Sequence, residues 1–181
     1  MRLSPAERAR RLAKIRLVLT DVDGVLTSGV IYHFVDTAGE LVEFKGIHSQ
    51  DSIAMAWLAE SGLTTGVISG RVSKGTDARL RLLKVKHIYQ HRLDKADVFA
   101  EILAKEGLAP EQAAYLGDDL TDLPVMRRAA LGVAPASARP EVLAAAHWVV
   151  RARGGDGAFR EFAEALLKRQ GLWDAILARY R

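Results

Sequence analysis

Residues 15–24 read IRLVLTDVDG, an apolar run that ends in two aspartates and a glycine. Four of the first six residues are Ile, Leu or Val, which is typical of a strand buried on both faces of a parallel sheet. The polar residues that follow then lie at the carboxyl end of the strand, where open α/β sheets bind their ligands. The stretch therefore predicts a central strand and a functional site together.

Similar apolar runs recur along the chain, and stretches with helical spacing separate them. The predicted strands are residues 64–69, 87–89, 113–117, 131–134 and 147–150. The predicted helices are residues 51–61, 73–83, 94–106, 119–129 and 139–146. Because strands alternate with helices, we predict an α/β fold with a doubly wound, Rossmann-like parallel sheet. We expect a single domain over residues 1–181 with no large cap domain.

Two strand-like runs interrupt this alternation directly after the first strand. Residues 30–35 and 40–44 flank the turn-like sequence DTAG at residues 36–39, which predicts a β-hairpin insertion at about residues 29–45. A lone two-stranded ribbon has no means of burying the apolar side chains of these runs. The hairpin either packs on its own domain or pairs with copies of itself. We favour the second interpretation, because apolar edge strands are sites of subunit association.

Both ends of the chain carry recognisable signals. Ser4, Pro5 and Glu7 have the spacing of an N-cap, a first helical residue and a capping-box glutamate. The glycine run GGDG at residues 154–157 predicts a flexible joint before a helical tail at about residues 158–181.

The composition favours a cytoplasmic globular protein with a small-molecule ligand. The chain has 181 residues, 49% of them hydrophobic and 27% charged, and it contains no cysteine. Disulfide scaffolds and thiolate metal sites are therefore excluded. Residues 1–5 lack the apolar core of a signal peptide, and no run reaches the roughly 18 apolar residues of a membrane span. The net charge of +4 is spread over many segments, so we expect no nucleic-acid partner and no membrane partner.

Four successive strand ends carry side chains suited to phosphoryl transfer. They are Asp21 and Asp23, then Ser69, Gly70 and Arg71, then Lys95, then Asp118, Asp119 and Asp122. Two aspartates can share a hard divalent cation such as Mg²⁺, and one can attack phosphorus. A carboxylic acid two residues later can exchange protons with the leaving group and with water, while a hydroxyl and a cation bind phosphate oxygens. Each feature alone also fits a turn or a helix cap, and their joint order favours the chemistry.

These motifs resemble those of the haloacid dehalogenase superfamily of phosphatases. The matching sequences are DVDGVLT at residues 21–27, ISGR at residues 68–71, Lys95 and GDDLTD at residues 117–122. The resemblance implies a single hydrolase domain of this superfamily with four catalytic residues. Asp21 would be the nucleophile, Asp23 the general acid and base, and Ser69 and Lys95 the phosphate-binding residues.

The same resemblance implies the rest of the site. Mg²⁺ would be bound by Asp21, by Asp118 and by the backbone carbonyl of Asp23. The residues that bind substrate would be Ser69, Gly70, Arg71 and Lys95. Asp119 and Asp122 would orient the site.

Within the superfamily, the chain is similar to the capless branch that includes 3-deoxy-D-manno-octulosonate 8-phosphate phosphatase. The similarity rests on the short length, the hairpin after Gly29, the run DDLTDLPVM at residues 118–126 and the tail GGDGA at residues 154–158. In that branch the hairpins of a homotetramer form a barrel, and neighbouring subunits complete the active sites. The similarity implies a homotetramer, a phosphorylated sugar acid as substrate and a place in lipopolysaccharide biosynthesis.

One stretch departs from the pattern of this branch. After the hairpin the branch has Asn-Val-Arg-Asp-Gly, whereas residues 45–52 here read KGIHSQDS and contain no arginine. Neither His48 nor Gln50 reproduces the bidentate geometry with which arginine binds a sugar-acid carboxylate. The motifs therefore predict the reaction, and this stretch leaves the substrate open.

Three other functions compete with this interpretation. The chain could be a phosphatase or phosphoryl-handling subunit for another small ester, such as an aryl phosphate, within a larger assembly. It could also be a receiver-like phosphoacceptor domain or a catalytically silent subunit. The acidic pair on the first strand and the acidic cluster after Lys95 disfavour a receiver domain, and the complete set of polar residues disfavours a silent subunit.

Overall fold

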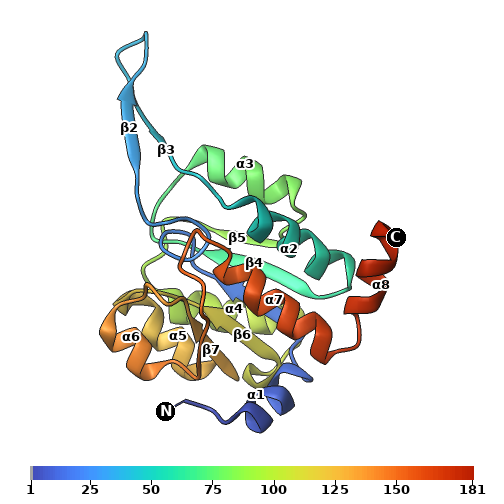
Figure 1. Ribbon diagram of the computed structural model, residues 1–181. Helices are drawn as coiled ribbons and strands as arrows, with labels where there is room; N and C mark the ends of the chain where they lie inside the picture. The colour runs from blue at the N-terminus through green and yellow to red at the C-terminus, as the bar shows by residue number, and fades with distance from the viewer. Residues whose placement is uncertain (1) are drawn as a thin grey trace.

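The computed structural model describes residues 2–181, and its centre is a six-stranded sheet in which all strands are parallel (Figure 1). The strand order is β5-β4-β1-β6-β7-β8. The strands are β1 (Leu17–Thr20), β4 (Thr64–Ile68), β5 (His87–Tyr89), β6 (Ala113–Leu116), β7 (Leu131–Ala134) and β8 (Trp148–Val149). The first predicted strand, residues 15–20, is thus central; the observed strand β1 is shorter, and all four of its residues are buried. The predicted doubly wound fold is confirmed, and the described residues form no large cap.

Helices cover both faces of the sheet, as the near-continuous apolar strands predict. The helices of one face are α1 (Pro5–Leu12), α2 (Ser49–Glu60), α3 (Lys74–Leu82) and α7 (Ala158–Arg169). Those of the other face are α4 (Lys95–Glu106), α5 (Leu123–Arg128) and α6 (Pro140–Ala145). Val18 packs in the first core, whereas Leu17 and Leu19 pack in the second. Successive side chains of a strand point to opposite faces, so one short strand supports both layers.

The remaining elements are short. They are η1 (Pro110–Gln112), η2 (Leu120–Asp122), α8 (Trp173–Leu177) and η3 (Ala178–Tyr180). The helix predicted at residues 119–129 is divided into η2 and α5, and the predicted capping box between Ser4 and Glu7 is confirmed. Within residues 2–181, none of the helices combines the length and apolar character that crossing a bilayer requires.

The glycine run before α7 is not a flexible joint, and that prediction was wrong. Gly154 lies against the loop that follows β1, and a side chain there would collide with the carbonyl group of Gly24. The amide of Gly155 donates a hydrogen bond to the carbonyl of Val25 at 2.9 Å. Here the missing side chains permit a close approach of two backbones. The run therefore fixes the start of α7 against the predicted catalytic loop.

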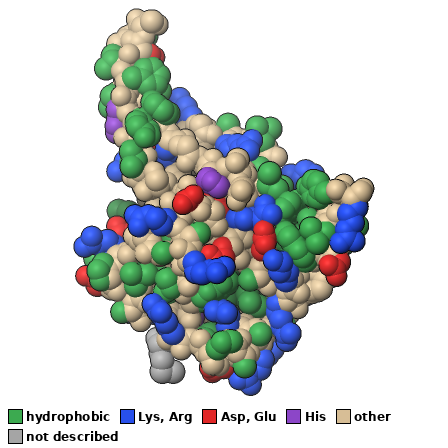
Figure 2. All heavy atoms as spheres, viewed as in Figure 1, with side chains coloured by type: hydrophobic (Ala, Val, Ile, Leu, Met, Phe, Trp, Pro, Cys, Tyr) green, Lys and Arg blue, Asp and Glu red, His purple; other side chains and the backbone are tan. Residues whose placement is uncertain are grey.

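The predicted hairpin is confirmed and projects from the body of the protein (Figure 1). It pairs β2 (Tyr32–Val35) with β3 (Leu41–Phe44), and Oδ1 of Asp36 accepts hydrogen bonds from the turn amides of Ala38 and Glu40. Figure 2 shows apolar side chains along the projection. The exposed apolar residues are Val30, Tyr32, Phe34, Val35, Leu41 and Phe44. The first of the two interpretations, packing on the hairpin's own domain, therefore does not hold for these side chains.

Candidate active site

The loop after β1 places Asp21 at the carboxyl edge of the sheet. The amide of Asp21 continues the ladder to the carbonyl of Leu116 at 2.9 Å, and the side chain is buried. The amide of Val22 donates to Oδ1 of Asp21 at 2.7 Å, which restricts rotation of the carboxylate. Gly24 then turns the chain with φ of +91°, and a side chain there would collide with the carboxylate of Asp118. Glycine at position 24 thus lets the loops after β1 and β6 meet.

Three carboxylates converge at this edge. Asp21, Asp118 and Asp122 each offer an oxygen within 4.8 Å of the others. The structure thereby brings together predicted residues from the first and the fourth strand ends. The carboxylate of Asp23 lies outside this cluster.

Asp122 is buried, and its carboxylate holds several other residues of the site in place by hydrogen bonds. Its Oδ1 accepts hydrogen bonds from Nζ of Lys95 and from the hydroxyl of Tyr115, both at 2.7 Å. Its Oδ2 accepts from the amides of Asp118 at 2.9 Å and Asp119 at 3.1 Å. Burial, together with the charge of Asp122, raises the pKa of Tyr115 well above its usual value, so the hydroxyl stays a donor. Sequence reasoning missed Tyr115, because a tyrosine within an apolar strand is typical of core packing.

Lys95 contacts both Asp122 and Asp21, the predicted nucleophile that follows β1. It begins α4, its side chain is 3% exposed, and its Nζ lies 3.2 Å from Oδ2 of Asp21. Burial acts to lower the pKa of Lys95, but the negative charges of Asp122 and Asp21 outweigh it and raise that pKa. The ammonium group is therefore charged at neutral pH, and it is held beside Asp21 in a fixed position.

The charges of the site fit a divalent cation. Burial, then the charge of Asp122, raises the pKa of Asp21 to about 7, and the same two causes raise the pKa of Asp118 to about 7. Oδ1 of Asp118 is buried and has no hydrogen-bond partner within residues 2–181. A hard cation such as Mg²⁺ takes carboxylate and water oxygens and would offset this excess negative charge. Asp122 is a poor ligand, because both of its oxygens already accept two hydrogen bonds each.

The loop after β4 carries the predicted residues Ser69, Gly70 and Arg71. Ser69 is 4% exposed, and its Oγ accepts a hydrogen bond from the amide of Arg71 at 3.2 Å. Its own hydroxyl proton has no acceptor in the part of the chain that the structure describes, so it remains available to a ligand. Arg71 is exposed, and its Nε lies 3.8 Å from Oδ2 of Asp23. Asp119 also lies at the surface, where its Oδ1 caps the amide of Leu120 at 2.7 Å.

The structure adds Lys45, which sequence reasoning missed. Its Nζ donates hydrogen bonds to Oδ1 and Oδ2 of Asp23 at 2.8 and 2.9 Å and lies 3.2 Å from Oε1 of Glu43. In the sequence this lysine has the appearance of an ordinary solvated residue at the end of a strand-like run. An available signal was the spacing of Glu43 and Lys45, because residues two apart in an extended segment share a face, and Lys45 directly follows β3.

Comparison with known proteins gives a consistent assignment. The haloacid dehalogenase-like hydrolase family matches residues 45–161. The chain is 41% identical over 161 residues to the 3-deoxy-D-manno-octulosonate 8-phosphate phosphatase KdsC of Yersinia pestis, covering 89% of this chain and 84% of that protein. It is 38% identical over 169 residues to KdsC of Escherichia coli strain K12, covering 93% and 88% of the two chains.

A solved structure has the same fold over nearly the whole chain. It is the 3-deoxy-D-manno-octulosonate 8-phosphate phosphatase from Moraxella catarrhalis, in complex with a magnesium ion, a phosphate ion and a molecule of 3-deoxy-D-manno-octulosonate (KDO). The TM-score is 0.92 at 32% identity, and the match covers 98% of this chain and all of that chain. This chain belongs to the haloacid dehalogenase-like hydrolase family.

Proposed function

We propose that this protein is a Mg²⁺-dependent phosphomonoester hydrolase that works through an aspartyl-phosphate on Asp21. The observation that carries the proposal is the setting of Asp21 between a fixed ammonium and an acidic pocket. Nζ of Lys95 lies 3.2 Å from Asp21, and the unpartnered carboxylate oxygen of Asp118 belongs to the same cluster. Membership of a hydrolase family supports this reaction over a receiver-like phosphoacceptor function.

In the first half-reaction an oxygen of Asp21 forms a bond to phosphorus while the bond from phosphorus to the leaving oxygen breaks. The leaving oxygen takes a proton from the carboxylic acid of Asp23. Lys95 and the free hydroxyl proton of Ser69 bind the non-bridging phosphoryl oxygens, where the charge is redistributed. Because Asp122 holds Lys95 in place, the ammonium needs little reorganisation during the reaction.

In the second half-reaction Asp23 takes a proton from a water molecule. The water oxygen forms a bond to phosphorus as the bond between phosphorus and Asp21 breaks, which releases inorganic phosphate and restores the carboxylate. Asp23 is partly exposed, unlike Asp21, so water has access to its side chain.

Asp21, Asp118 and the backbone carbonyl of Asp23 would hold the Mg²⁺ ion. When bound, the ion supplies positive charge that offsets the repulsion between the aspartates and an incoming phosphate. The collision that any side chain at Gly24 would have with Asp118 supports this proposal, because it places the carboxylate of Asp118 directly against the loop that carries Asp21 and Asp23.

The substrate we propose is a phosphorylated sugar acid such as 3-deoxy-D-manno-octulosonate 8-phosphate. Relatives at about 40% identity carry the name of this activity, and the Moraxella catarrhalis structure holds magnesium, phosphate and KDO. In this chain Arg71 supports the proposal, because its exposed guanidinium lies on the Asp23 side of the site, where the leaving group would bind. A guanidinium suits a carboxylate on that leaving group.

A substrate profile at saturating Mg²⁺ tests this function. We expect multiple turnovers of the octulosonate 8-phosphate, faster than those of glucose 6-phosphate, and loss of both activities in EDTA. Equal rates for the two sugars would overturn the named substrate and favour a different small ester, such as an aryl phosphate. A stable stoichiometric phosphoprotein without turnover would overturn the hydrolase itself.

We also propose that the hairpin assembles the protein into a homotetramer. The support is the exposed apolar surface of β2 and β3, including a stacked pair, Tyr32 and Phe44, with ring centroids 5.1 Å apart. Exposed apolar patches of this kind mark association surfaces. Light scattering of the purified protein measures the subunit number directly, and a monomer at micromolar concentration would contradict the assembly.

A further inference from the structure

We propose that Lys45 is a positioning residue that fixes the carboxyl group of Asp23 for proton transfer to the leaving group. This inference rests on the function proposed above, in which Asp23 is the acid and base. Lys45 follows β3 directly, so it comes from the base of the hairpin and not from the sheet that carries the other site residues.

The ammonium group of Lys45 is buried, so it needs interactions that compensate for the loss of water. Its side chain is only 2% exposed, although its neighbours Phe44 and Gly46 are exposed. A buried ammonium is costly unless it is paired and hydrogen-bonded. The two oxygens of Asp23 accept hydrogen bonds from it. Oε1 of Glu43 forms an ion pair with it at 3.2 Å, and this buried oxygen has no hydrogen-bond partner among residues 2–181. Glu43 therefore holds Lys45 from the hairpin side, and Lys45 holds Asp23.

The two oxygens of Asp23 have different surroundings. Oδ1 lies 2.8 Å from Nζ of Lys45 and 3.5 Å from the hydroxyl of the buried residue Thr27. Oδ2 lies 2.9 Å from Lys45 and 3.8 Å from the exposed guanidinium of Arg71. Lys45 therefore holds both oxygens, and Oδ1 is the oxygen on the side of the buried Thr27. Oδ2 is the oxygen on the side of the exposed Arg71, which is where we place the leaving group.

This arrangement limits how the carboxyl group can rotate. A proton donor must come within about 2.6–3.2 Å of the oxygen that it protonates, and its alignment determines how often transfer succeeds. With Oδ1 anchored, Oδ2 is the oxygen directed at the leaving group. Without Lys45, only the long contact with Thr27 would remain on Oδ1, and the carboxyl group would lose this orientation.

A positioning role and a purely structural role predict different dependences on the leaving group. Protonation matters most for an ester with a poor leaving group, such as phenyl phosphate. It matters least for p-nitrophenyl phosphate, whose leaving group departs as a stable anion. A loss of positioning therefore lowers kcat/KM mainly for phenyl phosphate, whereas a general disturbance of the site lowers both values equally. The ratio kcat/KM includes every step up to departure of the leaving group.

The experiment compares Lys45→Met with the wild-type enzyme on both esters at saturating Mg²⁺. Methionine keeps the length of the side chain and removes its charge. We expect kcat/KM for phenyl phosphate to fall by about 100-fold, the lower range of general acid catalysis, and that for p-nitrophenyl phosphate to fall by less than about tenfold. Lys45→Arg keeps the charge, and we expect it to recover part of the selective loss.

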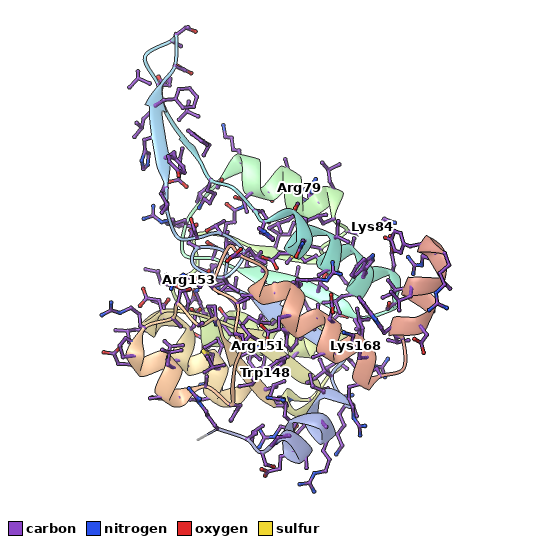
Figure 3. The ribbon with its side chains drawn as sticks, viewed as in Figure 1. Arg79, Lys84, Trp148, Arg151, Arg153 and Lys168 are labelled. Atoms are coloured by element: carbon purple, nitrogen blue, oxygen red, sulfur yellow. The ribbon has the colours of Figure 1, made fainter. Side chains whose placement is uncertain are left out.

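A matched control is Lys168→Met, which also breaks a lysine–carboxylate pair. Lys168 pairs with Glu164 at 2.9 Å on α7, and Figure 3 places it on the far part of that helix, away from the hairpin. We expect both rate constants to stay at the wild-type values. Glu43→Gln is a second test that leaves Lys45 in place, and we expect a smaller loss with the same selectivity for phenyl phosphate.

Equal losses on the two esters, or no loss on either, would overturn the positioning role. If Lys45→Met does not fold, as shown by the absence of a thermal transition, Glu43→Gln and Lys45→Arg decide by the same ratio. The proposed function fails separately: in that case the wild-type enzyme hydrolyses neither ester, or Asp21→Asn hydrolyses both.

Discussion

The catalytic edge of the sheet and the hairpin both depart from the usual distribution of polarity, in opposite directions. At the edge, Asp21, Lys95 and Asp122 are buried. On the hairpin, large apolar residues such as Phe34 and Leu41 are exposed. Charged side chains are almost never fully buried unless they are paired, and large exposed apolar patches mark interaction surfaces.

Burying charged groups and exposing apolar surface both cost free energy, and the two regions differ in which contacts offset that cost. Asp122 satisfies the charge of Lys95 within the chain, at 2.7 Å, and a bound cation would complete the balance for Asp21. No described part of the chain covers the apolar surface of the hairpin. In the assembly proposed above, a second subunit would cover it. The comparison indicates that contacts within the chain hold the active site, whereas the apolar face of the hairpin would be covered only in the proposed assembly. Lys45 joins the two, because it leaves β3 and binds Asp23.

The largest effect should follow a change of Asp21, the proposed nucleophile. Asp21→Asn keeps the oxygen that accepts the hydrogen bond from Val22, so we expect an intact fold. We expect kcat for p-nitrophenyl phosphate to fall by roughly a thousandfold or more, as for other covalent nucleophiles. Initial rates and a thermal melt of the same sample measure both properties. Activity close to wild type would remove Asp21 from the mechanism.

The next prediction tests whether contacts within the chain stabilise the buried polar groups at the carboxyl edge of the sheet. Asp122→Ala leaves Lys95 and Tyr115 buried without their shared acceptor, and we expect the free energy of unfolding to fall by about 3–5 kcal/mol. Asp119→Ala is the matched control. It removes only a surface cap, and we expect a loss below about 1 kcal/mol. Urea titrations compare the two variants, and equal losses would contradict the organising role of Asp122.

The hairpin should show the reverse behaviour. Phe34→Ser and Phe44→Ser remove exposed apolar rings, so we expect the assembly to dissociate while the free energy of unfolding of a single chain changes by less than about 0.5 kcal/mol. Light scattering measures the assembly. Leu82→Ser on α3 is the control, because Leu82 is equally apolar and 76% exposed but lies outside the hairpin. Dissociation of that variant too would argue against a specific role of the hairpin.

The smallest effect concerns protons and Mg²⁺ at the edge. Burial and neighbouring charge raise the pKa of both Asp21 and Asp118 from 3.8 to about 7, so the metal-free folded state holds more protons than the unfolded state between about pH 4 and pH 7. Its stability therefore falls as the pH rises through this window. Mg²⁺ binds the ionised groups, so we expect it to raise Tm more at about pH 8 than at about pH 5. Asp118→Asn should reduce the difference, and a metal effect independent of pH would contradict this account.

Much of the fold could be predicted, because the information is local. A few adjacent residues are enough to predict the strand that begins near Leu17 and the turn at Gly24. The order of Asp21, Ser69, Lys95 and Asp118 along the chain also places them at one edge, because parallel strands share their carboxyl ends.

The remaining features depend on long-range contacts that no local pattern reveals. Lys45 reaches Asp23 only because the hairpin returns to the loop from which it left. The sequence around Tyr115 is that of a core strand, and only the fold places its hydroxyl beside Asp122. The prediction of a flexible joint at residues 154–157 fails for a different reason. Glycine permits either free rotation or close backbone contact, and only the position of Gly24 decides between them.

The most direct test of the central claim is chemical trapping of the intermediate. Borohydride reduces an aspartyl-phosphate to homoserine, and peptide mass spectrometry then locates the modified residue in enzyme that is turning over substrate with Mg²⁺. We predict homoserine at Asp21, dependent on both substrate and Mg²⁺ and absent in Asp21→Asn. Modification at Asp23 or Asp118 instead, or none at any aspartate under conditions of continuing turnover, would contradict the mechanism.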